Sequence, residues 1–271
     1  MVQELQVTER TSTNQSVERA LAVLKAFASD GGPLRASDIS KACDLGPSTT
    51  SRLLATLAEA AFVERDDAGT YRLGPVPITL AGAALNQSEL CRQARPIAYE
   101  VSCETGLGVN LAELRDSQVF YLLHFDGRLA PRSYTLIGRH NPLHATGLGK
   151  CLVSDLQATD VAQLLEGSLQ PYTPYTITDL AAFGEELARV RLRGFATEKE
   201  ELAFGRGCVA APIRGRNGSV VAAISISGPL SVISFDERGD ELGRMVIEAA
   251  DRIGTAIGAS HVRPMADGVG T

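Results

Sequence analysis

Four consecutive hydroxyl residues and an arginine precede an apolar run in GPSTTSRLL, from Gly46 to Leu54. If Leu54 lies on the buried face of a helix, Thr50 turns inward with it, and the other polar side chains point outward near the helix N-terminus. Hydroxyl and guanidinium groups there can hydrogen-bond to phosphates or to base edges, and a helix N-terminus favours a nearby anion. Alternatively, one hydroxyl, at Ser48 or its neighbour, caps the helix and the others are solvated. The outward set is Ser48, Thr49, Ser51, Arg52 and Thr56.

The segments around this stretch predict a helix-turn-helix. SVERALAVLKAF, from Ser16 to Phe27, has apolar residues at three- and four-residue spacing, which is typical of an amphipathic helix. A short second helix opens at Ser37, and Pro47 suits the first position of a third helix. A break of about three residues between two short helices is the spacing of a helix-turn-helix.

A small hairpin is predicted after the third helix. Residues 62–65 and 70–73 are strand-like and flank the turn residues 66–69. A helix-turn-helix with such a hairpin is a winged one, and Arg65 and Arg72 of the hairpin join the predicted DNA-binding set. In this context we favour DNA contact over capping alone as the reason for the surplus hydroxyls.

The segment HATGLGKC, residues 144–151, matches a phosphate-binding loop only in part. That loop needs a glycine five positions before its Gly-Lys pair and a Ser or Thr after it, and these positions hold His144 and Cys151. His140 and His144 have the spacing of a helical metal pair, but Pro142 between them would disrupt that helix. We therefore expect neither nucleotide binding nor a metal site.

The sequence gives equally weak support for a catalytic serine or cysteine nucleophile. Ser225 lies in no G-x-S-x-G elbow, and Cys208 lies inside a β-rich run rather than at a strand-to-helix turn. The five cysteines are widely spaced without a C-x-x-C pair, so they predict neither a disulfide framework nor zinc. We expect no catalytic residue and no cofactor, although nothing excludes an enzyme.

The chain has 271 residues, 44% of them hydrophobic, which is enough for one large globular domain or for two of ordinary size. A net charge of −6 argues against indiscriminate coating of nucleic acid, so any DNA contact must come from the placement of a few residues. No segment approaches the roughly 20 apolar residues of a membrane span, and the polar start lacks a secretion signal. The expected location is the cytoplasm, with no membrane partner.

The rest of the chain predicts an α+β domain. VNLAEL and QVFYLLHF are strand-like, and CVAAPIRGRNGSVVAAISIS predicts a hairpin around Asn217-Gly218. Helices are predicted after Pro96 and over residues 178–193 and 236–257. Helices beside a mainly antiparallel sheet make an α+β fold. A further helix, from Ile78 to Leu90, would connect the two regions.

Together these segments resemble the IclR family of bacterial transcriptional regulators. The N-terminal resemblance rests on SVERALAVLKAF, ASDISKACDLGPSTTSRLLATL and FVERDDAGTYRLG, and the C-terminal one on PLHATGLGKCL and GFATEKEELAFGRGCVAAPIRGRNGSVVAAISISGP. It implies a winged helix-turn-helix, a linker helix and a GAF-like effector-binding domain with an antiparallel sheet. Family members are typically dimers or dimers of dimers that bind operator DNA and respond to a small metabolite, the effector.

The resemblance also implies which residues would contact the effector. A Gly-Leu pair would offer backbone N–H groups, and four polar side chains would complete the site; the alternative is that all six serve only fold packing. The family commonly has Asp where this chain has Glu198, and Pro77 suggests that the linker helix starts late. The implied residues are Gly147, Leu148, Glu198, Cys208, Ser225 and Ser227.

We therefore expect a ligand-responsive repressor of a catabolic operon, released by a small carboxylic or aromatic acid or a related amide or hydrazide. The alternatives are a metabolite-processing enzyme and a sensor that acts through a protein partner. The expected organisation is a disordered arm over 1–15, the winged helix-turn-helix over 16–75, the linker helix over 76–90, the effector-binding domain over 91–260 and a disordered tail over 261–271.

Overall fold

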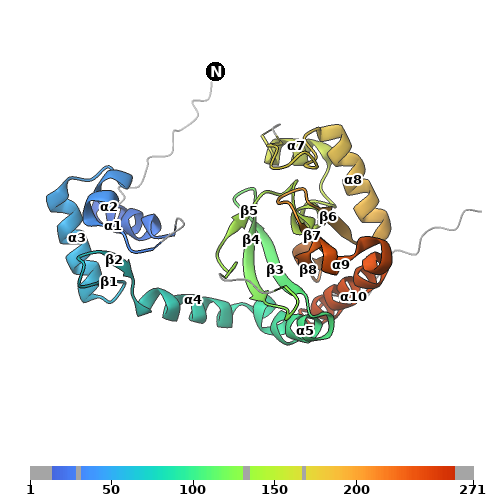
Figure 1. The fold of residues 1–271 in the computed structure, drawn as a ribbon, viewed down its shortest axis with the longest axis horizontal. Coiled ribbons are helices and arrows are strands. Elements are labelled where there is room, and N and C mark those ends of the chain that lie inside the picture. The colour runs from blue at the N-terminus through green and yellow to red at the C-terminus, as the bar shows by residue number, and fades with distance from the viewer. Residues whose placement is uncertain (1–13, 29–31, 131–134, 167–168, 260–271) are drawn as a thin grey trace, which may run out of the picture. The chain divides into compact units, whose positions relative to one another are not determined.

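The chain folds into two structural units, and the boundary between them lies after Ala84 (Figure 1). The computed structural model describes residues 14–28, 32–130, 135–166 and 169–259. The expected C-terminal tail lies outside the described residues, and so does the expected N-terminal arm up to residue 13. Residues 14 and 15 do not belong to a disordered arm, because Asn14 caps the first helix and Gln15 begins it.

The N-terminal unit is built from three helices and a hairpin around a small apolar core. In each helix, apolar residues recur at three- and four-residue spacing, so that one face of the helix is buried. The buried residues Val23, Ile39, Leu54, Leu57 and Val63 come from all three helices and the hairpin. The elements are α1 (Gln15–Ala26), α2 (Ala36–Ala42), α3 (Pro47–Glu59), β1 (Val63–Arg65) and β2 (Tyr71–Leu73).

Helix α3 begins as its sequence predicts, but not with the expected cap. Pro47 occupies the first helical turn, and Gly46 is the N-cap residue without a side-chain cap hydrogen bond. The alternative that Ser48 or its neighbour caps this helix is therefore wrong. Thr50 is buried as predicted, and its hydroxyl donates to the carbonyl of Gly46 at 3.2 Å.

Helix α4 (Pro75–Gln87) follows the hairpin and is unusual because it is apolar and none of its residues is buried. Ile78 and Leu80 are 76% and 54% exposed. The expectation that Pro77 delays this helix is wrong, because proline is tolerated in the first turn, where backbone N–H groups have no helical acceptor.

The C-terminal unit contains a six-stranded antiparallel sheet in the order β5-β4-β3-β8-β7-β6. Alternate residues of each strand face opposite sides, which gives the sheet two covered faces. One face packs against α5 and α10, which lie along it in Figure 1, and the other packs against α6 and α8. The strands are β3 (Gly108–Arg115), β4 (Gln118–Phe125), β5 (His140–Asn141), β6 (Ala196–Lys199), β7 (Arg206–Arg214) and β8 (Val220–Pro229).

The three helices predicted for this unit are present, one of them with a clearly different start, and the described residues also contain three short helices that were not predicted. The helix predicted after Pro96 begins earlier, at Glu89, because Ser88 accepts a hydrogen bond from the backbone of Cys91 and Pro96 is accommodated inside the helix. No helix in the described part of the chain combines the length and apolarity needed to span a bilayer. The helices are α5 (Glu89–Thr105), α6 (Gly147–Leu152), α7 (Ala158–Leu164), α8 (Leu180–Arg193), α9 (Leu230–Ile233) and α10 (Phe235–Ala256).

Candidate functional site

The outward-facing polar residues of α3 form a rim at the start of the helix. Ser48, Ser51, Arg52 and Thr56 are exposed, and Thr49 is half-buried. The Thr56 hydroxyl donates to the carbonyl of Arg52 at 3.2 Å, so part of its hydrogen-bonding capacity is used within the helix. The remaining hydroxyls and the Arg52 guanidinium can donate to phosphates and base edges.

The two arginines of the hairpin have partners within the hairpin itself. Arg72 on β2 donates through Nε and Nη2 to the Glu64 carboxylate of β1, at 3.1 and 2.9 Å. Arg65 lies 5.8 Å from the centre of the Tyr71 ring. Both arginines are exposed, but Arg72 shares its charge with a carboxylate that a phosphate would have to displace.

In the C-terminal unit, strand register places polar residues side by side on the sheet face that packs against α6. One cross-strand row runs Glu198, Cys208, Ser227 and Gly108 through β6, β7, β8 and β3. Because directly paired residues point to the same face, the side chains of this row and of the next row of the same face converge. The next row is Ala196, Ala210, Ser225, Asn110 and His124.

A cavity of about 560 Å³ lies over these two rows. All six residues that the resemblance implies for the effector line this one cavity, although they come from α6 and three different strands. Asn110, Tyr121 and Asn141 add further polar groups, and Arg139 and Arg206 add cationic ones. The lining is therefore suited to a small polar ligand.

Close approach of α6 to the sheet explains the glycines of HATGLGK. Thr146 is the N-cap residue and accepts from the backbone N–H of Gly149 at 3.0 Å. A Cβ on Gly149 would lie 2.1 Å from the carbonyl oxygen of Leu143, and a Cβ on Gly147 would lie 3.2 Å from Cys208 Sγ. The N–H of Gly147 is directed at the Cys208 sulfur, and burial raises the pKa of that thiol to about 12. Cys208 is thus a neutral thiol held beside the first turn of α6.

Glu198 is a buried carboxyl group whose environment favours the protonated form. Burial raises its pKa to about 7, the nearby Glu201 charge adds to the shift, and backbone hydrogen bonds partly oppose it. Those bonds come from the N–H groups of Glu201 and Leu202, which donate to Glu198 Oε1 at 2.7 and 3.3 Å. Near neutral pH this group exchanges between a hydrogen-bond donor and an acceptor.

Two family models together cover almost the whole described chain. The model described as the IclR helix-turn-helix domain matches residues 16–67, and the model described as the bacterial transcriptional regulator IclR C-terminal matches residues 82–255. The chain belongs to the IclR family of bacterial transcriptional regulators. As in the family, a helix-turn-helix domain precedes the C-terminal IclR domain, and the chain is a transcriptional regulator rather than an enzyme.

Named IclR-family relatives match along most of the chain. The HTH-type transcriptional regulator BhcR of Paracoccus denitrificans is 34% identical over 87% of this chain and 85% of its own length. The HTH-type transcriptional repressor AllR of Escherichia coli is 34% identical over 90% of both chains. The crystal structure of an IclR homolog complexed with 4-hydroxybenzoate, from Microbacterium hydrocarbonoxydans, has a TM-score of 0.79 at 26% identity and covers 91% of this chain and 100% of its own.

Asn110 and His124 were missed by reasoning from the sequence. Both lie in predicted strands, and the one available signal was a polar residue inside the apolar run Val109 to Ala112. Asn110 Nδ2 donates to the hydroxyls of Ser225 and Ser227 at 3.2 and 3.1 Å, so it contacts two of the implied effector residues directly.

A buried ion cluster behind the cavity was also missed. Lys150, only 1% exposed, donates to Glu201 Oε1 at 2.6 Å and to the carbonyl of Thr197 at 2.9 Å, and lies 3.6 Å from Glu186 Oε1. Within the described residues, Glu201 Oε2 is a buried oxygen without a hydrogen-bond partner. Lys150 therefore neutralises buried carboxylates, and through Glu201 this cluster supports the backbone that holds Glu198.

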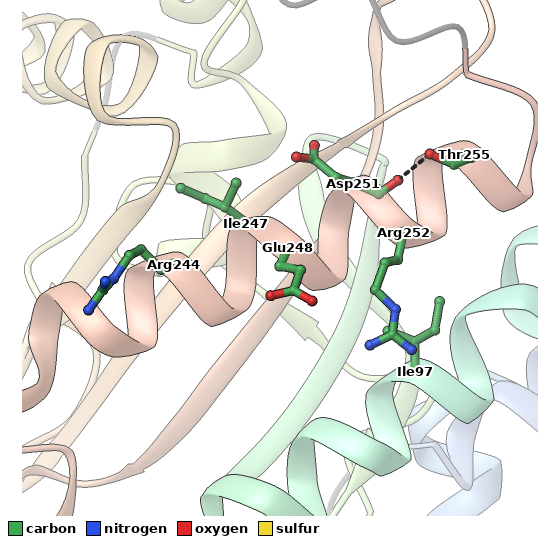
Figure 2. Close-up of a pocket in the computed structure, with 7 residues that line it drawn as sticks. All are labelled: Ile97, Arg244, Ile247, Glu248, Asp251, Arg252 and Thr255. Carbon is green, nitrogen blue, oxygen red and sulfur yellow. Dashed lines mark hydrogen bonds between the residues drawn. The ribbon is translucent and has the colours of Figure 1, made fainter.

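A second concavity lies on the outer side of α10 and lacks these features. Figure 2 shows Arg244, Ile247, Glu248, Asp251, Arg252 and Thr255 along α10, with Ile97 of α5 beside them. Arg252 is paired with Glu100 at 2.7 Å, and the Thr255 hydroxyl donates to the backbone of Asp251 at 2.8 Å. Its charged groups point along an exposed helix surface, so the cavity over the sheet is the better candidate for a small ligand.

Proposed function

We propose that this IclR-family regulator is a ligand-responsive repressor, which leaves its operator DNA when a small acid or a related amide occupies the cavity over the sheet. The observation that carries the proposal is the convergence of all six implied effector residues on that one cavity. We propose that this repressor acts in the cytoplasm and that the genes it controls form a catabolic operon.

DNA binding is assigned to the rim of α3. The second helix of a helix-turn-helix presents its N-terminal residues to base edges in the major groove. Four of the five rim residues are exposed, and Gly46 leaves the helix N-terminus without a side chain over it. Arg65 and Arg72 of the hairpin are assigned to the flanking phosphates.

We further propose that the chain acts as a homodimer, alone or paired into a dimer of dimers. Exposed apolar side chains on α4, and others on α1, support this proposal, since large exposed apolar groups are common at interaction sites. Ile78 and Leu80 of α4 are 76% and 54% exposed, and Val17 and Leu21 of α1 are 53% and 51% exposed. A dimer would present its two α3 helices to half-sites about 34 Å apart.

The chemistry of the cavity supports a small polar effector with an acid group. Its volume of about 560 Å³ lies within the usual range for small-molecule sites. Arg139 and Arg206 bring positive charge to the lining, which favours an anionic group. A solved relative is described as complexed with 4-hydroxybenzoate, a small aromatic acid. Effector binding would shift the DNA-bound population with a coupling free energy of about 1–3 kcal/mol.

The test uses the full chain and labelled double-stranded DNA from its own upstream region. We expect a saturable mobility shift that a scrambled duplex of equal length does not give, and that some small acids reverse. Failure to shift any upstream fragment would contradict the proposal and favour a sensor with a protein partner. Recovery of a bound compound in chemically altered form would instead favour an enzyme.

The dimer is tested separately by light scattering after size-exclusion chromatography. Ile78→Glu places a charge on the exposed apolar face of α4 and should convert the assembly to a smaller species. Leu192→Glu is the matched control, because Leu192 is 89% exposed on α8, outside the proposed interface. Equal masses for both variants and the unsubstituted chain would refute this interface.

A further inference from the structure

Asn110 lies at the centre of a hydrogen-bonded chain that ends in the cavity. It is 3% exposed, on β3, between His124 of β4 and Ser225 of β8 in the strand register. Its Oδ1 lies 2.7 Å from His124 Nδ1, and its Nδ2 donates to Ser225 and Ser227. His124 Nε2 lies 3.0 Å from Asp126 Oδ1. The side-chain amide is thus held at both ends.

The arrangement of this amide determines how the two serines are used. A side-chain NH₂ group has two hydrogens, and here one is directed at each serine oxygen. Each serine therefore accepts from Asn110 and keeps its own O–H hydrogen for another acceptor. Ser225 also lies beside the Cys208 sulfur, a weak acceptor that a stronger one would replace. Both serines line the cavity, where Ser227 is 8% exposed and Ser225 is fully buried, so the hydrogen of Ser227 is the more accessible of the two to a ligand oxygen.

We propose that Asn110 is a specificity-determining positioning residue, which sets both serines as hydrogen-bond donors and so selects an effector with a carboxylate at the β8 side of the cavity. This inference rests on the proposed function and adds which end of the effector is recognised there. Ionised acceptors form stronger hydrogen bonds than neutral ones, so two aligned hydroxyl donors favour a carboxylate over its amide.

Glu198 defines the opposite end of the same ligand. It lies two strands from Ser227 in the shared row, a separation of about 10 Å between backbones. In its ionised form its carboxylate accepts hydrogen bonds and repels a second carboxylate. The effector class is therefore a small carboxylate with a hydroxyl, amine or N–H group at its far end.

A flipped Asn110 side-chain amide, with Oδ1 and Nδ2 exchanged, would reverse this selectivity. The serines would then donate to Asn110 Oδ1 and offer only lone pairs to the cavity, and His124 would accept at Nδ1 from the amide. Such a cavity would favour the amide of a ligand over the acid. The two arrangements therefore predict opposite preferences within one matched pair of compounds.

The experiment measures calorimetric binding to the full chain, without DNA, for lactate, 4-aminobenzoate and 4-hydroxybenzoate, each beside its primary amide. We expect at least one acid to bind more tightly than its amide. In Asn110→Asp the serines must donate to the new carboxylate, so the acid-to-amide preference should fall about tenfold or more. Asn110→Leu should reduce the same preference without adding charge.

Asn141→Asp is the matched control, because Asn141 lines the same cavity but donates to the Tyr121 hydroxyl at 2.9 Å instead of to the serines. It introduces the same charge and should change the preference much less. Equal changes in the two Asp variants, a wild-type preference for the amides, or no bound acid would each overturn the inference. Since DNA is absent, a failure to bind the operator would count against the proposed function and leave this result intact.

Discussion

The two candidate sites use similar residue types in opposite environments. The α3 rim presents serine and threonine hydroxyls and an arginine to solvent, whereas Ser225 of the cavity is fully buried and Glu198 is 6% exposed. Exposed polar groups keep their hydrogen bonds to water, but buried ones must find partners within the protein. The rim is therefore free to exchange water for DNA, and the cavity must be organised before any ligand arrives.

This difference also separates the energetic roles of the two sites. Removing a rim side chain should alter DNA binding and leave folding nearly unchanged, since exposed substitutions rarely shift stability by more than about 0.5 kcal/mol. Removing a polar group behind the cavity should lower the free energy of unfolding. Its buried partners are then left without a hydrogen bond or an opposite charge, and water cannot reach them to replace it.

The largest expected effect is in the ion cluster behind the cavity. Lys150→Met leaves the buried carboxylate of Glu201 without its cation, whereas Glu186 keeps Arg189 at 2.9 Å, and should cost about 3–5 kcal/mol of unfolding free energy. Urea unfolding of the full chain measures this loss, which should be confined to the transition of the C-terminal unit.

Lys199→Met is the control for that loss, because Lys199 is an exposed lysine on the neighbouring strand β6. It should change stability by less than about 0.5 kcal/mol. Adding Glu201→Gln to Lys150→Met should recover part of the lost stability by removing one uncompensated charge. Equal stabilities for the Lys150 and Lys199 variants would show that the cluster contributes nothing to the difference between the two sites.

A second large effect concerns the pH dependence of the cavity wall. The pKa of Glu198 is about 7 in the folded chain against 4.5 as the ordinary value, so folding favours its protonated form. Its contribution to stability is full below pH 4.5 and is lost as the pH rises to 7. Glu198→Gln keeps the oxygen that accepts from the backbone and should gain about 2–3 kcal/mol over the unsubstituted chain at pH 8.

Thermal unfolding between pH 4.5 and 8 measures that gain. Glu185→Gln, on an exposed position of α8, is the control and should give a pH profile parallel to that of the unsubstituted chain. A Glu198→Gln gain that is constant over this range would mean that the carboxyl group does not titrate there, and the buried site would then resemble the exposed one in its response to pH.

A smaller effect is expected at the rim of α3. Arg52→Ala removes an exposed cation and should weaken operator binding about tenfold, with no change in the unfolding free energy beyond about 0.5 kcal/mol. Fluorescence anisotropy at several salt concentrations measures the affinity. Lys25→Ala removes the same charge from the exposed end of α1 and serves as the control. Unchanged affinity in the Arg52 variant would remove this residue from the DNA-binding set.

The same contrast explains which features were predictable from the sequence. The orientation of Thr50 and the outward rim follow from the period of a single helix, so residues 46–57 contain all the necessary information. The relation of Ser225 to Ser227 follows from the period of a single strand. Asn110, by contrast, meets these serines only because β3 pairs with β8, 115 residues further along the chain.

The remaining errors have one local and one long-range physical cause. The position of a proline in the sequence does not reveal whether a helix accommodates it. Helix α5 contains Pro96 in its interior, and α4 contains Pro77 in its first turn. The buried role of Lys150 could not be read from HATGLGKC, since its partners Glu186 and Glu201 lie on α8 and after β6. The resemblance implied the six effector residues, but the register of the sheet shows how they come together.

The smallest effect tests whether the hairpin behaves like the rim. Glu64→Gln removes the carboxylate that holds Arg72 at 2.9 Å, and exposed pairs of this kind contribute only about 0–1 kcal/mol. If Arg72 contacts a phosphate, operator affinity should rise about two- to fivefold, and the salt dependence should steepen by about one released counterion. Glu59→Gln removes the same charge from the C-terminal end of α3 and should leave the salt dependence unchanged. An unaltered salt dependence in Glu64→Gln would mean that Arg72 serves the hairpin alone, so that this exposed arginine has the same internal role as the buried Lys150.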